Sequence, residues 1–114
     1  MTTTLTVTTL IAVFPVAAVA STVADAKREI RRLWGDRAST MECVVRFESG
    51  WNPRAVSRTG DHGLSQLNAY TWRRHFGQRW ALVYDPVANI RIAYEVYVRA
   101  GRSFRPWVAY RYCR

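Results

Sequence analysis

Glu48 is an acidic side chain with the surroundings that acid–base chemistry requires. It takes the i+7 place of an apolar helical stripe that starts at Met41 and continues through Val44. A carboxyl group there is partly withdrawn from water and lies within about a turn of the negative end of the helix dipole, and both effects should raise its pKa. Such a carboxyl can act as a general acid. The alternative is an ion pair with a neighbouring arginine at a fraying helix end, without a catalytic role.

Asp61 offers a second carboxyl group, thirteen residues later, in a segment (50–68) whose Gly, Pro, Asn, Ser and Asp residues predict turns and at most a short hairpin. Two carboxyl groups in one cleft suffice for glycoside hydrolysis. One protonates the leaving oxygen, and the other, ionised, attacks or stabilises the developing positive charge. An apolar helix face suits the first role and a polar loop suits the second. The alternative for Asp61 is a turn residue that bonds its own backbone before Gly63.

The elements that must position these side chains are mostly helical. Helices are predicted over 26–34 and through the stripe that ends at Glu48, where Ser39 or Thr40 could be the N-cap. A short helix over 69–76 should stop at Gly77, and a longer one should have Asp85 as N-cap, Pro86 at N1 and Gly101 as terminator. Its expected apolar stripe is Val87, Ile90, Tyr94, Tyr97 and Val98. The fold class is therefore α+β, mostly α, with a short irregular β-hairpin.

The first 24 residues differ from the rest, because every charged side chain lies at Asp25 or later. Leu10 to Ala20 is an apolar run followed by small residues, and Ala18-Val19-Ala20 and Thr22-Val23-Ala24 are candidate cleavage sites. We expect residues 1–24 to be a signal peptide and 25–114 a single catalytic domain, secreted or held in the cell envelope. No Lys or Arg precedes the apolar run, so an uncleaved anchor, with transient membrane contact through residues 1–24, is the alternative.

The two cysteines, Cys43 and Cys113, are 70 positions apart. A domain of this size gains from a covalent brace, and a bridge between them would stabilise it by roughly 4 kcal/mol if chain entropy dominates. Export would permit that bridge, whereas two free buried thiols are the alternative. The histidines, His62 and His75, lie near neither cysteine, so we expect no metal site and no cofactor.

Basic residues outnumber acidic ones by 17 to 8, and all of them except Lys27 are arginine. This excess favours a polyanionic partner, and nucleic acid, acidic phospholipid and bacterial cell wall all qualify. No recognised nucleic-acid-binding motif accompanies the arginines, so we do not expect nucleic acid to be the partner.

Three separated blocks of the sequence resemble c-type lysozymes. Residues 43–49, Cys-Val-Val-Arg-Phe-Glu-Ser, are similar to that family's catalytic-helix segment, including a cysteine five residues before the acid. Residues 61–68, Asp-His-Gly-Leu-Ser-Gln-Leu-Asn, resemble the strand that bears its second carboxylate. Residues 107–113, Trp-Val-Ala-Tyr-Arg-Tyr-Cys, resemble its C-terminal segment, which ends in the cysteine that bridges to the helix.

The resemblance implies a lysozyme-like domain and a role for each matching residue. Glu48 would be the acid, Asp61 the nucleophile or charge stabiliser, and Trp107 the aromatic wall that withdraws Glu48 from water. Sugar contacts would come from Gln66, Asn68 and Trp72. The sequence differs from the family in its cysteines: with two of them, only one of the disulfides usual in that family can form.

A second resemblance, to soluble lytic transglycosylases, shares the same acid. It rests on Glu48-Ser49, Asn52-Pro53, Ala55, Ser57, Gly60, Gly63-Leu64-x-Gln66 and Asp85-Pro86-x-x-Asn89-Ile90. Those enzymes need one carboxylate, which protonates the bridging oxygen and then, as a base, lets the 6-hydroxyl of muramic acid attack. Ser49 would lie beside the substrate. Asp61 stands where those enzymes usually have a small residue, and their Ala-Tyr-Asn-Ala-Gly helix is absent.

The sequence thus favours a monomeric peptidoglycan muramidase, which hydrolyses the β-1,4 bond between N-acetylmuramic acid and N-acetylglucosamine. The first alternative is a lytic transglycosylase that cuts the same bond and leaves 1,6-anhydromuramic acid. The second, from another class, is a non-catalytic cationic protein that binds the cell wall or a membrane.

Overall fold

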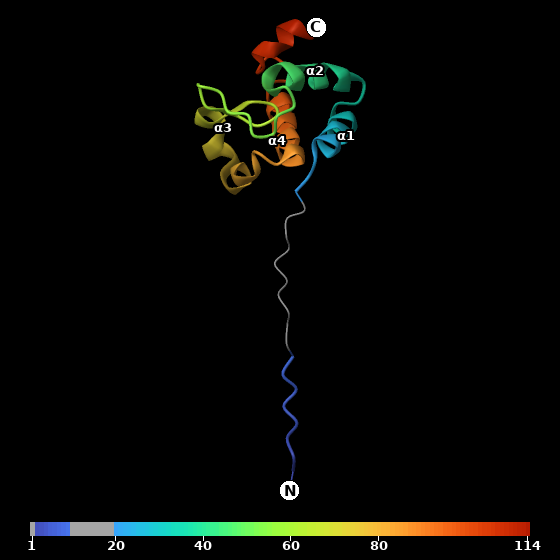
Figure 1. Cartoon of the computed structure of the whole chain (residues 1–114), viewed down its shortest axis with the longest axis vertical. Helices are drawn as coiled ribbons and strands as arrows, with labels where there is room; N and C mark the ends of the chain where they lie inside the picture. The colour runs from blue at the N-terminus through green and yellow to red at the C-terminus, as the bar shows by residue number, and fades with distance from the viewer. Residues whose placement is uncertain (1, 10–19) are drawn as a thin grey trace.

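Helices form most of the domain, and a small hairpin lies to one side of them (Figure 1). The computed structural model describes residues 2–9 and 20–114. Within this part of the chain the elements are α1 (Val23–Trp34), the 3-10 helix η1 (Gly35–Arg37), α2 (Ala38–Ser49), β1 (Asp61–His62), β2 (Leu67–Asn68), α3 (Ala69–Phe76), η2 (Gly77–Leu82), α4 (Pro86–Arg99) and η3 (Val108–Tyr112). The predicted fold class, mostly α with a short hairpin, is confirmed.

Most of the predicted leader lies outside this description. The apolar run at 10–20 is outside the described residues except for Ala20, and residues 2–9 have no regular secondary structure. No helix among the described residues is long and apolar enough to cross a membrane. Among the described residues, the first hydrogen bond to the domain comes from Ser21, whose backbone N–H donates to Asp85 Oδ1 at 3.0 Å.

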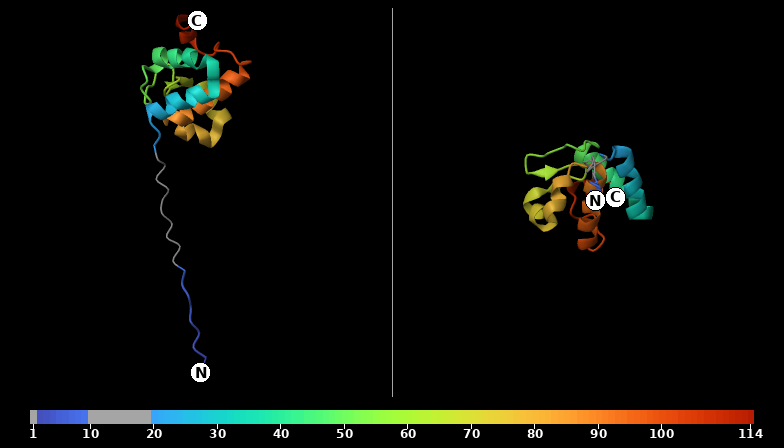
Figure 2. Two further views of the ribbon diagram at one scale, coloured as in Figure 1. Left: turned by 90° about the vertical axis from the view of Figure 1, so that its right-hand side faces the viewer. Right: turned by 90° about the horizontal axis from the view of Figure 1, so that it is seen from below.

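Helix α1 starts three residues before the predicted position, because Thr22 caps it. The Thr22 hydroxyl accepts a hydrogen bond from Asp25 N–H, and the Asp25 carboxylate accepts one from Thr22 N–H, which is a reciprocal capping box. The buried side chains Ala26, Ile30 and Trp34 are spaced at i, i+4 and i+8 along one face. This face packs against α4 and α2, and Figure 2 shows α1 beside both helices.

Helix α2 has the predicted apolar stripe but a different start. Met41, Val44 and Val45 are fully buried, whereas the helix begins at Ala38 and has no side-chain cap. The prediction of Ser39 or Thr40 as N-cap is therefore wrong. The helix starts earlier because a 3-10 turn precedes it. The N–H of Ala38 donates to the Gly35 carbonyl of this turn, and the chain enters the helix without a polar cap.

Helix α4 has the predicted Asp85 cap, whose Oδ2 accepts a hydrogen bond from Ala88 N–H at 2.9 Å, and Pro86 follows it. The predicted stripe is only partly buried. Ile90 and Tyr97 are buried, whereas Val98 is exposed. The buried face instead includes Ile92, Ala93 and Val96. Helix α4 is covered by α1 on one side and faces the hairpin on another (Figure 1), so a wider face is withdrawn from water than one stripe.

The last segment returns to α2 and is bonded to it. Cys43 and Cys113 form a disulfide with a Cα–Cα distance of 5.7 Å, so the predicted pairing is present. Helix η3, which precedes Cys113, packs against α2. The C-terminal segment is thereby placed next to the end of α2, where Glu48 lies.

Candidate active site

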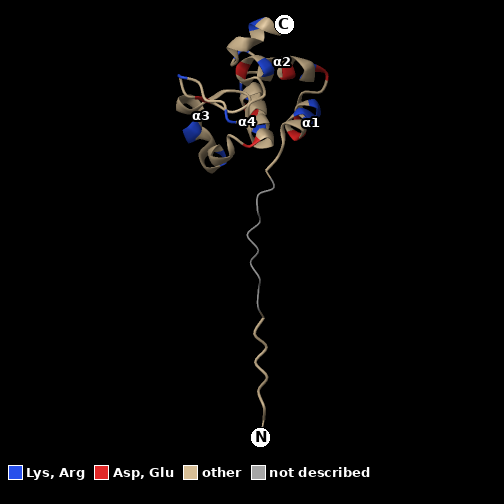
Figure 3. Ribbon diagram, in the orientation of Figure 1, with Lys and Arg blue, Asp and Glu red and all other residues tan. Residues whose placement is uncertain are grey.

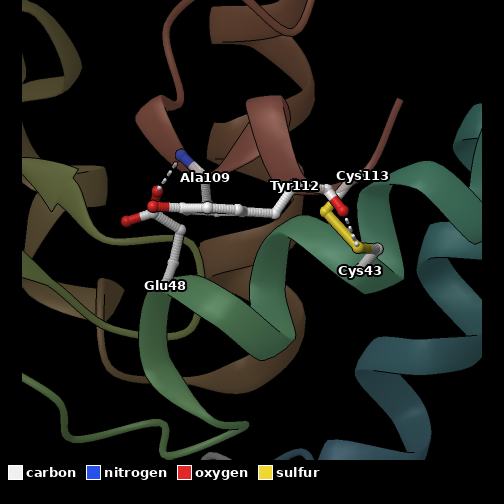
Figure 4. The surroundings of a disulfide bond; sticks show 5 residues. All are labelled: Cys43, Glu48, Ala109, Tyr112 and Cys113. Atoms are coloured by element: carbon white, nitrogen blue, oxygen red, sulfur yellow. Dashed lines mark hydrogen bonds between the residues drawn. A yellow bond between two sulfur atoms is a disulfide. The ribbon is translucent and has the colours of Figure 1, made fainter.

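Glu48 is the penultimate residue of α2, and its side chain points toward η3 (Figure 4). Its carboxyl is half-buried, and Oε1 accepts a hydrogen bond from the backbone N–H of Ala109 at 3.2 Å. Five residues before Glu48 on the same helix, Cys43 forms the disulfide with Cys113, the residue that follows η3. One covalent bond and one hydrogen bond therefore fix the C-terminal segment against the helix that carries the candidate acid.

The surroundings of Glu48 favour its protonated form. Burial raises the pKa of its carboxyl, the hydrogen bond from Ala109 N–H works in the opposite direction, and the negative charge of Asp61 raises the pKa again. The pKa of Glu48 therefore lies above its ordinary value. A carboxyl that keeps its proton at higher pH can deliver it to a leaving oxygen, as the sequence predicted.

Asp61, on β1, has the opposite character. Its Oδ2 accepts hydrogen bonds from Ser57 Oγ at 2.6 Å and Thr59 Oγ1 at 2.7 Å, and its Oδ1 accepts one from Asn68 Nδ2 at 2.9 Å. Partial burial alone would raise the pKa of Asp61, but these hydrogen bonds outweigh it and hold the pKa below its ordinary value. Asp61 is therefore an ionised group at neutral pH.

The same hydrogen bonds give Asp61 a structural role. Asp61 pairs with Asn68 across the antiparallel hairpin, and Ser57 and Thr59 come from the turn before β1. Both carboxylate oxygens are occupied by partners within the loop. These bonds make Asp61 the anchor of the loop and a fixed negative charge near Glu48.

A cavity of about 260 Å³ lies between the hairpin, α3, α4 and the C-terminal segment. Its lining is formed by Asp61, Gln66, Leu67, Asn68, Thr71, Trp72, Val96, Pro106 and Trp107. Five residues predicted for the site are thus brought together here. The two other predicted residues, Glu48 and Ser49, do not line this cavity, and the Ser49 hydroxyl donates back to the Val45 carbonyl of its own helix at 3.1 Å.

The polar residues of the cavity are held by the protein itself. Asn68 caps α3 through Oδ1, which accepts from Thr71 N–H at 2.9 Å, while its Nδ2 donates to Asp61 and to the Thr59 carbonyl. Gln66 donates from Nε2 to the carbonyls of Ala55 and Gly63. The structure therefore places both amides as supports of the loop, with the oxygen of Gln66 accepting no hydrogen bond within the described residues.

The two tryptophans of the cavity differ. Trp107 is buried, and its Nε1 donates to the Ser65 carbonyl at 2.9 Å, which ties the C-terminal segment to the hairpin turn. The hydrogen bond that this segment makes to Glu48 comes from Ala109, two residues later. Trp72 is only partly buried and contacts Phe76 with ring centroids 5.7 Å apart, so part of its ring remains available for stacking on a sugar.

Asn89, which belongs to the transglycosylase-like block but had no predicted role in the site, positions the hairpin. This residue of α4 is fully buried, and its Oδ1 accepts hydrogen bonds from both the backbone N–H and the hydroxyl of Ser65, at 3.0 and 2.6 Å. Its Nδ2 donates to the carbonyls of His62 and Val83. Gly63 allows this close approach, since a Cβ there would lie 2.3 Å from Asn89 Nδ2 and 2.6 Å from the Val83 oxygen. An asparagine beside buried apolar positions of α4 is the sequence signal for this role.

No group of three or more His, Cys, Asp or Glu side chains that could bind a metal ion is present among the described residues. The site as described is an acid at a helix end, an ionised carboxylate in a hairpin and a cavity with one accessible aromatic face.

Comparison with known proteins gives one family. The family model "Transglycosylase SLT domain" matches residues 26–111, which include every residue of the candidate site. No curated protein and no solved structure matches the chain.

Proposed function

This chain belongs to the transglycosylase SLT domain family, a family of lysozyme-like enzymes that cleave peptidoglycan, and we propose that it is a lytic transglycosylase. It would cut the β-1,4 bond between N-acetylmuramic acid and N-acetylglucosamine and leave a 1,6-anhydromuramic acid end. The sequence favoured hydrolysis of this bond by two carboxylates. The family match supports the one-carboxylate alternative better.

The observation that carries this proposal is the contrast between the two carboxyl groups. Glu48 is half-buried with a raised pKa, whereas both oxygens of Asp61 accept hydrogen bonds within the loop. A single group that alternates between acid and base is sufficient for transglycosylation. Asp61 is held by Ser57, Thr59 and Asn68 as a fixed charge, a role that needs no covalent bond to the sugar.

In the proposed reaction Glu48 acts twice. Its carboxyl first gives a proton to the bridging oxygen, and the bond between this oxygen and C1 of N-acetylmuramic acid breaks. The carboxylate then takes the proton of the 6-hydroxyl of the same sugar, whose oxygen forms a new bond to C1. Glu48 ends protonated, and no water is consumed. The N–H of Ala109 supports the second step, because it donates to the ionised form of Glu48 between the two transfers.

The fixed charge of Asp61 would assist the first step. Bond cleavage leaves positive charge on the sugar ring, and an ionised carboxylate that is held in place by Ser57, Thr59 and Asn68 can stabilise this charge without forming a bond. The same charge raises the pKa of Glu48 and so keeps the acid protonated before the reaction.

Substrate chemistry and charge agree with this proposal. Peptidoglycan is anionic, and the chain carries a formal net charge of +9. Figure 3 shows Lys and Arg on α1, α2, α3 and α4 rather than in one patch, so the attraction is general rather than directed at one point. Since the substrate lies outside the cytoplasm, we also propose that the protein acts after export, in the cell envelope or as a secreted enzyme.

A second hollow would accommodate a longer glycan strand. It measures about 1110 Å³ and is lined by residues of the turn before β1 and of α3, among them Arg73 and Arg74. Thr71 lines both this hollow and the cavity beside Trp72. We propose that a glycan strand extends across Thr71 from one space to the other, where the two arginines would meet carboxylates of the peptidoglycan stem.

Product analysis tests the proposed reaction. Purified peptidoglycan would be digested in water enriched in heavy oxygen, and the fragments would be analysed by mass spectrometry. We expect anhydro ends, each one water lighter than a reducing end and without the label. Reducing ends that carry the label as the main product would establish hydrolysis and overturn the proposal. A digest with Glu48→Gln controls for contaminating activity.

A further inference from the structure

Ser21 is the first residue that contacts the domain within the described part of the chain, and three hydrogen bonds hold it. Its backbone N–H donates to Asp85 Oδ1 at 3.0 Å, and its hydroxyl donates to the same oxygen at 2.8 Å. The hydroxyl also accepts from Val87 N–H at 2.9 Å. Ala20, the residue before it, is exposed and has no regular secondary structure. Within residues 2–9 and 20–114, hydrogen bonds to the domain therefore begin immediately after the Ala20–Ser21 bond.

Asp85 is suited to receive a positive charge at this point. Its Oδ2 accepts from Ala88 N–H as the cap of α4, so Oδ1 remains for Ser21. Partial burial would raise the pKa of Asp85, but the hydrogen bonds from Ala88 and Ser21 lower it below its ordinary value, so the group is ionised at neutral pH. Arg91 is the other charged group that acts on it. An ammonium group in place of the Ser21 amide would turn a neutral hydrogen bond into a charge-assisted one.

We propose that proteolytic processing cleaves the chain between Ala20 and Ser21, and that the new α-ammonium group of Ser21 pairs with the Asp85 carboxylate. The residues before the bond, Ala18-Val19-Ala20, have the small-x-small pattern that signal peptidases recognise. Processing at this bond leaves every contact of Ser21 in place and adds a charge to one of them.

The structure distinguishes this bond from the other candidate, after Ala24. Cleavage there would remove Ser21 together with its three hydrogen bonds to α4. It would also remove Thr22, which forms the capping box with Asp25, and the first two residues of α1. Cleavage after Ala24 would therefore destabilise the mature protein, because α1 would lose its cap and α4 would lose its hydrogen bonds to Ser21.

Export of the full chain tests the cleavage position. The chain would be produced in a bacterium that exports it, and the mature protein would be analysed by intact mass and N-terminal sequencing. We expect a chain that begins with Ser21. A chain that begins with Asp25, or one that retains residues before Ser21, would overturn the proposal. The result does not depend on catalysis, so it is separate from the proposed function.

Selective acetylation tests the ion pair. Lys27 is the only lysine, and Lys27→Arg keeps a cation over the Trp51 ring, 4.6 Å from its centroid in the native protein. In the mature Lys27→Arg protein the α-amine is then the only primary amine, and acetylation removes its charge alone. We expect acetylation to lower the unfolding temperature by a few degrees.

Asp85→Asn is the matched variant, because an asparagine side chain can still cap α4 while its charge is lost. In Lys27→Arg/Asp85→Asn we expect acetylation to change the unfolding temperature by less than half as much. An equal effect of acetylation in both proteins, or no effect in either, would show that the Ser21 ammonium group does not pair with Asp85.

Discussion

The backbone N–H of Ala109 donates a hydrogen bond to Glu48 Oε1 at 3.2 Å, so the candidate acid is contacted by a segment 61 residues away in the sequence. This contact favours the ionised carboxylate, whereas burial of Glu48 favours the protonated one. The two effects act on the same group in opposite directions. That balance is what a residue requires if it must give away a proton and then take one back.

Glu48→Gln should abolish cleavage. The amide has nearly the same size and can still accept from Ala109 N–H, but it has no acidic proton to give. We expect turnover of purified peptidoglycan to fall by a factor of about 100 or more, measured as muropeptide release. Glu42→Gln is the control on the same helix, where the carboxylate pairs with Arg31 at 3.4 Å, and it should keep its activity. Wild-type turnover of Glu48→Gln would remove Glu48 from the mechanism.

Asp61→Asn should affect stability more than catalysis. The variant loses the charge that accepts three hydrogen bonds and places an amide near the donor of Asn68, which should cost about 1–3 kcal/mol of unfolding free energy. If Asp61 acts only as an anchor and a fixed charge, turnover of the folded variant should stay within about tenfold of wild type. A loss as deep as that of Glu48→Gln, measured below the unfolding temperature, would instead support a nucleophile.

The raised pKa of Glu48 should appear in the pH dependence of both rate and stability. The acid must be protonated, so the rate should fall on the alkaline side as pH rises through a pKa above the ordinary 4.5. The folded state also binds this proton more tightly than the unfolded chain does. Stability contributed by protonated Glu48 is therefore present at low pH and is lost as pH rises through the folded-state pKa.

Unfolding by guanidinium at several pH values checks the sign of this effect. Relative to Glu48→Gln, the wild type should lose stability as pH rises from about 4.5 through the raised pKa. A difference between the two proteins that is constant with pH would contradict the raised pKa.

The disulfide should support both stability and the site. Cys43→Ser/Cys113→Ser removes a link that spans 70 residues, for which the chain-entropy model gives a loss of about 4 kcal/mol. The link joins α2 to Cys113, the residue after η3, so its loss should also loosen Ala109 against Glu48. We expect activity below that of the wild type even at temperatures where the variant is folded by circular dichroism. Reduced wild-type protein should behave like the double variant, and unchanged activity in both would separate the disulfide from the site.

Gly63→Ala compared with Gly60→Ala isolates the close approach of Asn89. Both glycines have positive φ, 75° and 80°, so alanine is strained at either position by about 1 kcal/mol. A Cβ at Gly60 meets nothing within 4 Å, whereas at Gly63 it meets Asn89 and the Val83 carbonyl. Gly63→Ala should therefore cost about 1–3 kcal/mol more in unfolding free energy. Equal losses in denaturant titrations would show that Asn89 does not hold the turn closely.

The sequence by itself determined the features that depend on near neighbours. The stripe from Met41 to Val45, the Asp85 cap with Pro86, and the stop of α3 at Gly77 follow from residues three or four apart, and all appear in the structure. The prediction from near neighbours was wrong at the start of α2. There a carbonyl of the preceding 3-10 turn accepts a hydrogen bond from the first residue of the helix, so the helix starts without an N-cap side chain.

Only the tertiary structure decided how the site is assembled. Three sets of hydrogen bonds join residues that are 24 to 64 positions apart: those from Ala109 to Glu48, from Ser65 to Asn89 and from Ser21 to Asp85. No periodicity or capping rule reaches so far, because such contacts depend on how whole helices pack. The same holds for Asp61: the sequence showed a second carboxylate, and only the folded loop showed that Ser57, Thr59 and Asn68 occupy both of its oxygens.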